Sequence, residues 1–200
     1  MPRGFSESEQ ELIRERLEQE GEKLFTAKGI RHTTVADLAR AAGIAKGSFY
    51  RFVPSKEELF FDILEKAEAE IRAELEKELR EAGEDVEIRL WVASERAVRV
   101  LTERPLFRIF LDPQELRALE RGVSPQRMRA HLSGDEGFFE KLFGSLLSRP
   151  SDAAVGAGLL KVLVFLPTLE AFIGRDVLPE VAQRLVEYIA SGLAREAEVQ

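Results

Sequence analysis

Cysteine is absent from the sequence, which excludes disulfide bonds, thiolate nucleophiles and cysteine-ligated zinc sites. Only two histidines occur, and glycine-rich phosphate loops and the His/carboxylate spacing of metal sites are missing. The segment His131–Glu136 places carboxylates beside a histidine, and we expect it to be a solvated loop. We therefore expect no metal, no cofactor and no enzymatic activity. The lack of cysteine also fits a cytoplasmic protein, because disulfides are rare where thiols stay reduced.

Sustained alternation of polar and apolar residues is also absent, so no segment predicts a half-buried β-strand. Apolar residues recur instead at helical spacing, in runs separated by Gly, Pro and Ser/Thr/Asp signals. The sequence therefore predicts an all-α protein, with a three-helix domain over residues 1–54 and a helical domain over residues 55–200. The predicted helices cover residues 8–28, 35–42, 46–53, 55–82, 86–103, 106–111, 114–121, 126–148, 152–173 and 177–198.

One apolar run, Ala153–Gly174, is long enough to cross a bilayer, which needs about 20 residues. It contains Lys161, Pro167 and Glu170, however, and strongly polar segments follow it. Its small residues permit close helix approach, and residues 177–194 carry an apolar stripe that could pair with it. We therefore expect no membrane association and predict that these two helices form a homodimer interface.

Charge is distributed unevenly along the chain. The formal net charge of -7 on its own argues against a nucleic-acid partner. Between Lys23 and Pro54, however, Asp37 is the only acidic residue. A basic block inside an acidic protein is typical of a nucleic-acid site, although a solvated basic face would look the same by charge alone. The basic residues of this block are Lys23, Lys28, Arg31, Arg40, Lys46 and Arg51.

The segment from Thr33 to Lys56, TTVADLARAAGIAKGSFYRFVPSK, has the pattern of a helix-turn-helix. Thr34 and Asp37 form a capping-box pattern at the start of the first short helix. Gly43 allows the turn a positive φ, and the small Ala39 permits a steep helix crossing. The second helix begins near Lys46 and is presented outward, so that it can enter a major groove.

The segment Leu24–Phe60 resembles the tetracycline-repressor (TetR) family of transcriptional regulators. It has the family's threonine pair, its Lys-Gly-small-aromatic-Tyr run and its Pro-Ser-Lys-Glu run. Phe52 departs from the family's usual Tyr or His and has no hydroxyl or imidazole to donate to a phosphate. Arg51 is the candidate for guanine readout, because its fork can pair with O6 and N7. The resemblance implies that DNA is contacted by Thr33, Thr34, Lys46, Gly47, Ser48, Tyr50, Arg51 and Lys56.

The C-terminal two-thirds of the chain is rich in aromatic residues. These could form an ordinary helical core, or they could line a pocket, because ligand sites are mostly apolar with few polar groups. An arginine in such a pocket could pair with an acidic group of the ligand. The candidate pocket residues are Trp91, Arg96, Phe107, Arg108, Phe110, Phe139, Phe143 and Phe165.

Together these features predict a ligand-responsive transcriptional repressor. We expect it to bind a palindromic double-stranded operator as a homodimer and to be released by a small apolar or amphipathic effector. Activation instead of repression stays open. The alternatives are an architectural or ligand-independent DNA-binding dimer and a helical enzyme. An enclosed C-terminal pocket would favour the sensor, and a filled core would favour the architectural dimer.

Overall fold

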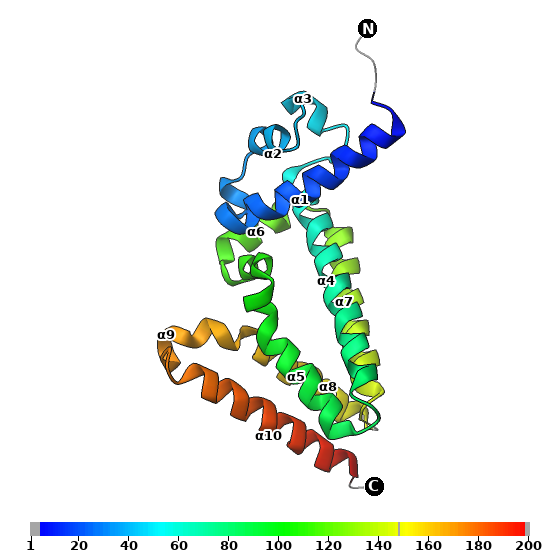
Figure 1. Cartoon of the computed structure of the whole chain (residues 1–200), viewed down its shortest axis with the longest axis vertical. Helices are drawn as coiled ribbons and strands as arrows, with labels where there is room; N and C mark the ends of the chain where they lie inside the picture. Colours follow the sequence, from blue (N-terminus) through cyan, green and yellow to red (C-terminus); the bar gives the residue numbers. More distant parts are fainter. Residues whose placement is uncertain (1–4, 148, 199–200) are drawn as a thin grey trace. The chain divides into compact units, whose positions relative to one another are not determined.

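The computed structural model describes residues 5–147 and 149–198 (Figure 1). Over this range every regular element is a helix, which confirms the predicted all-α class. The side chains of Phe110, Pro150 and Glu198 lie outside the description. The elements are α1 (Glu7–His32), α2 (Val35–Ala41), α3 (Lys46–Phe49), α4 (Lys56–Glu81), α5 (Val86–Glu103), η1 (Pro105–Leu111), α6 (Pro113–Gly122), α7 (Pro125–Gly144), α8 (Pro150–Phe165), η2 (Leu166–Leu169), α9 (Glu170–Ile173) and α10 (Leu178–Glu198).

Four predicted helices differ from the structure. The second helix of the helix-turn-helix, α3, ends at Phe49 and not at residue 53, and α7 ends at Gly144 and not at residue 148. Residues 105–111 form a tighter 3₁₀ helix. The helix predicted over 152–173 is divided into α8, η2 and α9, because Pro167 has no N–H to donate and its ring crowds the preceding turn.

The chain folds as two compact units. The first comprises Met1–Glu68 and Leu106–Arg129, so that it joins the helix-turn-helix to η1 and α6. Its core contains fully buried aromatic rings, among which Phe25 and Phe60 meet edge to face with centroids 5.4 Å apart. The division into domains predicted after residue 54 stays a prediction.

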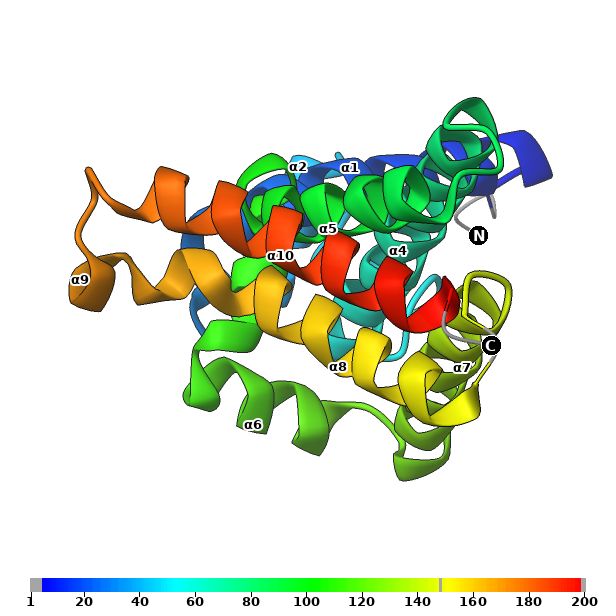
Figure 2. The same ribbon diagram turned by 90° about the horizontal axis from the view of Figure 1, so that it is seen from below.

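The second unit comprises Ala69–Pro105 and Ala130–Gln200. Helix α5 packs against both α8 and α10, and Figure 2 shows these three helices side by side. Leu90, Leu163 and Ala190 belong to their shared buried core. Helix α8 also approaches α7 closely, because a Cβ on Gly156 would lie 2.5 Å from a ring carbon of Phe143.

Among the described residues, one stretch has the length and composition of a membrane span, Ser151–Ile173. Lys161 and Glu170 interrupt its apolar surface, and its helix is broken at Pro167. A single stretch of this kind is weak evidence of a membrane protein, and we interpret it as part of the folded second unit.

Candidate DNA-binding interface

A capping box fixes the start of α2, as predicted. The Asp37 N–H donates to Thr34 Oγ1 at 3.1 Å, and Thr34 donates from its own N–H to Asp37 Oδ2 at 3.2 Å. Hydrogen bonds from the Thr34 side chain and backbone hold the pKa of Asp37 below its usual value. Thr34 itself is exposed, so the N-terminal end of α2 faces solvent.

The turn between α2 and α3 has a backbone geometry that favours glycine. Gly43 has a φ of +75°, which confirms the predicted positive value. The Ile44 N–H donates to the Ala39 carbonyl at 2.9 Å and closes the turn. Ala39 is only 1% exposed, as expected for the small residue at the crossing point of two short helices.

Helix α3 is anchored by one face and exposes the other. Phe49 is fully buried, and Val53 is buried just beyond the helix end. The opposite side of α3 and the turn that follows it present five of the predicted DNA-contacting residues. Lys46, Gly47, Tyr50 and Arg51 are exposed, and Ser48 is half-buried.

Thr33 and Lys56 differ from the other predicted DNA contacts, because their polar atoms form hydrogen bonds within the first unit. The buried Thr33 hydroxyl donates to the Gly29 carbonyl at 2.7 Å. The Lys56 ammonium donates to the carbonyls of Ile30 at 2.6 Å and Thr33 at 2.8 Å. Both side chains therefore satisfy carbonyls at the C-terminal end of α1, and their direct contact with DNA stays a prediction.

The sequence did not predict the role of Glu115, which accepts hydrogen bonds from backbone N–H groups near the C-terminal end of α1. Its carboxylate is 6% exposed, and Oε2 accepts from the Ile30 N–H at 2.7 Å and the Arg31 N–H at 3.1 Å. Gly29, predicted to follow the end of α1, has φ +75° and ψ 172°, so the helix is interrupted there. A Cβ on Gly29 would lie 2.7 Å from Glu115 Oε1, so this carboxylate needs a glycine beside it.

Arg127 forms a cluster of ion pairs with carboxylates of α4 in the first unit, which the sequence also did not predict. It donates to Glu58, and to Asp62 and Glu65 at 2.6 Å each. Its guanidinium also lies 4.7 Å from the centroid of the Phe61 ring. Burial raises the pKa of Asp62, and the hydrogen bond from Arg127 opposes that rise.

The predicted pocket residues are scattered. In the second unit, Phe139 lines a cavity of about 630 Å³ between α7 and α8, and Trp91 lines one of about 430 Å³ between α5 and α10. Phe143 is buried in the core and Phe165 is 47% exposed. In the first unit, Phe107 is buried and Arg108 is exposed, while the side chain of Phe110 lies outside the description.

Arg96, the other arginine predicted to meet a ligand, is held by carboxylates of its own unit. Its guanidinium bonds to Glu78, to Glu103 at 3.1 Å and to Glu74 at 3.3 Å, and its side chain is 12% exposed. Desolvation by burial works to lower the pKa of Arg96, but hydrogen bonding and the charge of Glu78 outweigh it and leave the pKa raised.

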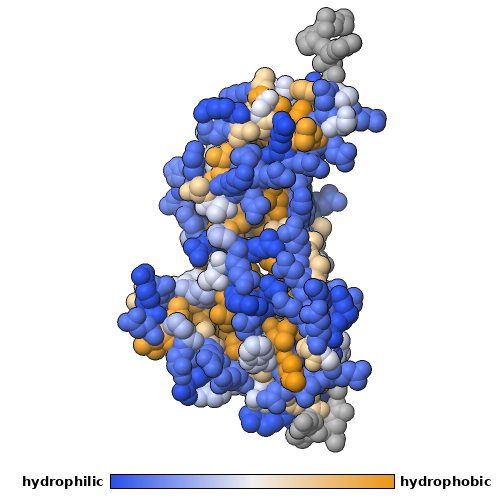
Figure 3. Space-filling view, viewed as in Figure 1, coloured by the Kyte–Doolittle hydropathy of each residue, from blue (hydrophilic) through white to orange (hydrophobic). Residues whose placement is uncertain are grey.

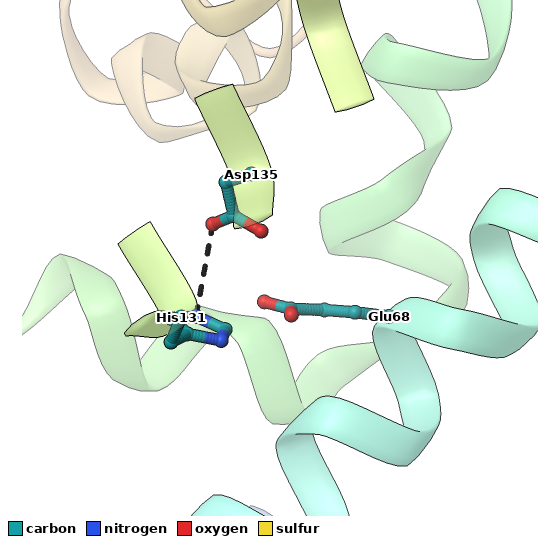
Figure 4. A group of neighbouring side chains, drawn as sticks. All are labelled: Glu68, His131 and Asp135. Atoms are coloured by element: carbon teal, nitrogen blue, oxygen red, sulfur yellow. Dashed lines mark ion pairs between the residues drawn. The ribbon is translucent and has the colours of Figure 1, made fainter. Parts of the chain in front are cut away.

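The segment His131–Glu136 is helical, as the helix predicted over residues 126–148 requires, and the solvated loop expected there is wrong. It lies inside α7, which runs without interruption through Gly134 and Gly137. His131 and Asp135, one turn apart, form an ion pair of 3.6 Å between Nε2 and Oδ2 (Figure 4). Arg72 also pairs with Asp135, and it lies 5.1 Å from the centroid of the Phe138 ring.

A substitution at Gly47 should affect operator affinity and the free energy of unfolding differently, and both can be measured. Replacing it with alanine should leave the free energy of unfolding unchanged or raise it by up to about 1 kcal/mol, because a Cβ there meets no atom within 4 Å and alanine favours helix. The same Cβ would obstruct a DNA surface at α3, so operator affinity should fall several-fold in fluorescence anisotropy. Gly43→Ala is the control, which should lose stability through its positive φ. Unchanged operator affinity of Gly47→Ala would contradict the placement of DNA against α3.

The architecture of an outward recognition helix and a second all-helical unit is shared with known proteins. Residues 19–63 match the model of the bacterial regulatory proteins of the tetR family. No curated protein sequence matches the chain.

Solved structures extend the likeness to most of the chain. The TetR family transcriptional regulator PfmR from Thermus thermophilus is 27% identical, with a TM-score of 0.62 over 88% of this chain and 95% of PfmR. FadR from Bacillus subtilis, solved with stearoyl-CoA, is 14% identical, with a TM-score of 0.63 over 89% of this chain and 98% of FadR. NalD of Pseudomonas aeruginosa, the secondary repressor of the MexAB-OprM efflux pump, is 21% identical, with a TM-score of 0.54 over 93% of this chain and 95% of NalD.

The fold and the helix-turn-helix define a transcription regulator with a helical DNA-binding domain. The match of residues 19–63 to the tetR-family model and the likeness of most of the chain to a TetR-family regulator confirm the predicted resemblance.

Proposed function

We propose that the protein is a cytoplasmic repressor that binds a palindromic operator as a homodimer and is released by a small apolar or amphipathic effector. The observation that carries this proposal is the exposed surface of α3 and of the turn that follows it, where Lys46, Gly47, Tyr50 and Arg51 are exposed beside the buried Phe49. A short helix with a buried anchor and a basic, polar outer face suits the major groove.

An exposed apolar surface supports the dimer. Figure 3 shows orange, hydrophobic residues at the surface near α9 and the start of α10. Phe172 is 90% exposed, and a ring of this size gains from burial against another surface. A second copy of the chain is the partner that a palindromic operator requires, because its symmetry mirrors that of a dimer. The large exposed apolar residues of the segment from α8 to α10 are Val155, Val162, Phe165, Leu169, Phe172, Val177 and Tyr188.

The cavity between α7 and α8 supports a small-molecule effector. Its volume of about 630 Å³ falls within the range of ligand pockets. Its lining combines Phe139 with the cationic Lys161 and two carboxylates, Glu136 and Glu140, beside small residues. An amphipathic molecule matches such a mixed lining. FadR, whose structure holds stearoyl-CoA, is an example of this fold with an amphipathic ligand.

Selection of bound duplexes from a random pool, followed by a screen for compounds that release them, tests the proposal. We expect a palindromic site whose half-sites lie about one DNA turn apart, roughly 34–36 Å, with affinity that falls steeply as salt rises. A releasing compound should bind the DNA-free protein more tightly, and the operator should weaken its binding by the same factor. Equal binding to all duplexes at physiological salt would refute operator binding, and a tight ligand without effect on operator affinity would refute the switch.

A further inference from the structure

Residues 5 and 6, directly ahead of α1, are tied to the first turn of the helix by three hydrogen bonds. The Ser6 N–H donates to Glu9 Oε2 at 2.7 Å, and the Glu9 N–H donates to Ser6 Oγ at 3.3 Å, which completes a capping box. The Gln10 side chain donates to the Phe5 carbonyl at 3.0 Å. The backbone of Phe5 is therefore held by the first turn of the helix.

The Phe5 ring lies against the residues that follow α3. Its centroid is 5.7 Å from that of Phe52, with the rings tilted by 48°. The Arg51 guanidinium carbon is 5.2 Å from the Phe5 centroid, which is within the reach of a cation–π contact. Phe5 and Phe52 are half-buried, whereas Arg51 is exposed. An aromatic pair thus supports the side chain that we assign to base readout.

A supported arginine has an advantage over a free one. A long exposed side chain loses conformational entropy when it is ordered on a base. Stacking against a ring restricts the guanidinium beforehand and leaves the N–H groups at its edge free to donate. A stacked Arg51 can therefore still present its fork to O6 and N7 of a guanine.

We propose that Phe5 is a positioning residue that holds Arg51 for base readout and thereby contributes to operator specificity. The proposal rests on the proposed function, because it assumes that α3 enters the major groove. Phe52 contributes the second ring of the pair. The residue that stands in place of the family's usual Tyr or His therefore packs against Phe5 in this chain.

The test compares full-length variants for discrimination, the ratio of affinities for the selected operator and for one with the Arg51-dependent base pair exchanged. Phe5→Ala should lower discrimination about 2- to 5-fold, the size of an exposed cation–π contact. Phe5→Leu keeps an apolar contact with Phe52 but has no ring face, so it should lose discrimination as well, whereas Phe5→Tyr should keep it. Leu12→Ala, at an exposed apolar residue of α1, is the matched control and should change nothing.

Two further measurements separate this role from a structural one. In an Arg51→Ala background, Phe5→Ala should cause no additional loss of discrimination, because the contact is already absent. The affinity for non-specific duplex and the midpoint of thermal unfolding should stay near those of the unsubstituted protein.

Unchanged discrimination in Phe5→Ala, or an equal loss with and without Arg51, would overturn the positioning role while leaving operator binding intact. If the unsubstituted protein showed no sequence preference, the proposed function would fail together with this inference.

Discussion

Replacing Glu115 with alanine should lower the free energy of unfolding by roughly 2–3 kcal/mol, because the N–H groups of Ile30 and Arg31 would lose a charged acceptor. Water cannot easily replace the carboxylate at a site that is 6% exposed. The loss should appear as a lower midpoint in urea or thermal unfolding, followed by circular dichroism of the full chain.

Two substitutions give this prediction its controls. Glu115→Gln keeps an acceptor oxygen of the same reach and should lose less stability than alanine. Glu120→Ala removes an exposed glutamate from the same helix and should change stability by no more than about 0.5 kcal/mol. Equal effects of Glu115→Ala and Glu120→Ala would show that the carboxylate contributes nothing to the end of α1.

Replacing Arg51 with alanine should cost roughly 1–3 kcal/mol of operator binding free energy and relax base preference at one position of each half-site. Arg51→Lys should also lose the preference but keep more of the affinity, because an ammonium retains the charge without the two-pronged fork. The measurement is anisotropy on the selected operator and on duplexes changed at single positions.

Lys46→Ala is the matched comparison for Arg51. Lys46 is exposed at the start of α3, so its loss should weaken all duplexes about equally and reduce the dependence of affinity on salt by about one phosphate contact. If Arg51→Ala behaved in the same uniform way, the base-reading role would belong to another exposed residue of α3 or of the turn that follows it.

The parts of the first unit that sequence predicted correctly depend on neighbours within a few residues. The Thr34–Asp37 capping box spans three residues, and the positive φ of Gly43 follows from the turn around it. Phe49 is buried on the inward face of α3, as predicted, and Arg51 is exposed in the turn directly after the helix. Local chemistry decides these features, so a single sequence reveals them.

Contacts between residues distant in sequence could not be predicted in the same way. Glu115 reaches Ile30 across 85 residues, and its place in the first turn of α6 looks like that of any surface glutamate. The family resemblance implies that Lys56 contacts DNA, and nothing in the sequence indicated that its ammonium bonds to carbonyls at the end of α1. Arg96 has the charge to meet an acidic ligand, but three carboxylates already surround it. Tertiary packing, which no local pattern encodes, decides these roles.

The unit that holds the helix-turn-helix is encoded by two separate segments of the chain. A recombination event with one crossover after residue 54 would transfer α1 without Glu115. In such a hybrid the N–H groups of Ile30 and Arg31 would have lost their acceptor. The crossover would also separate the helix-turn-helix from Lys56, which bonds to the carbonyls of the same turn. A hybrid regulator that exchanges recognition helices between relatives therefore needs either a much smaller insert, α2 to α3 alone, or a second segment carrying α6.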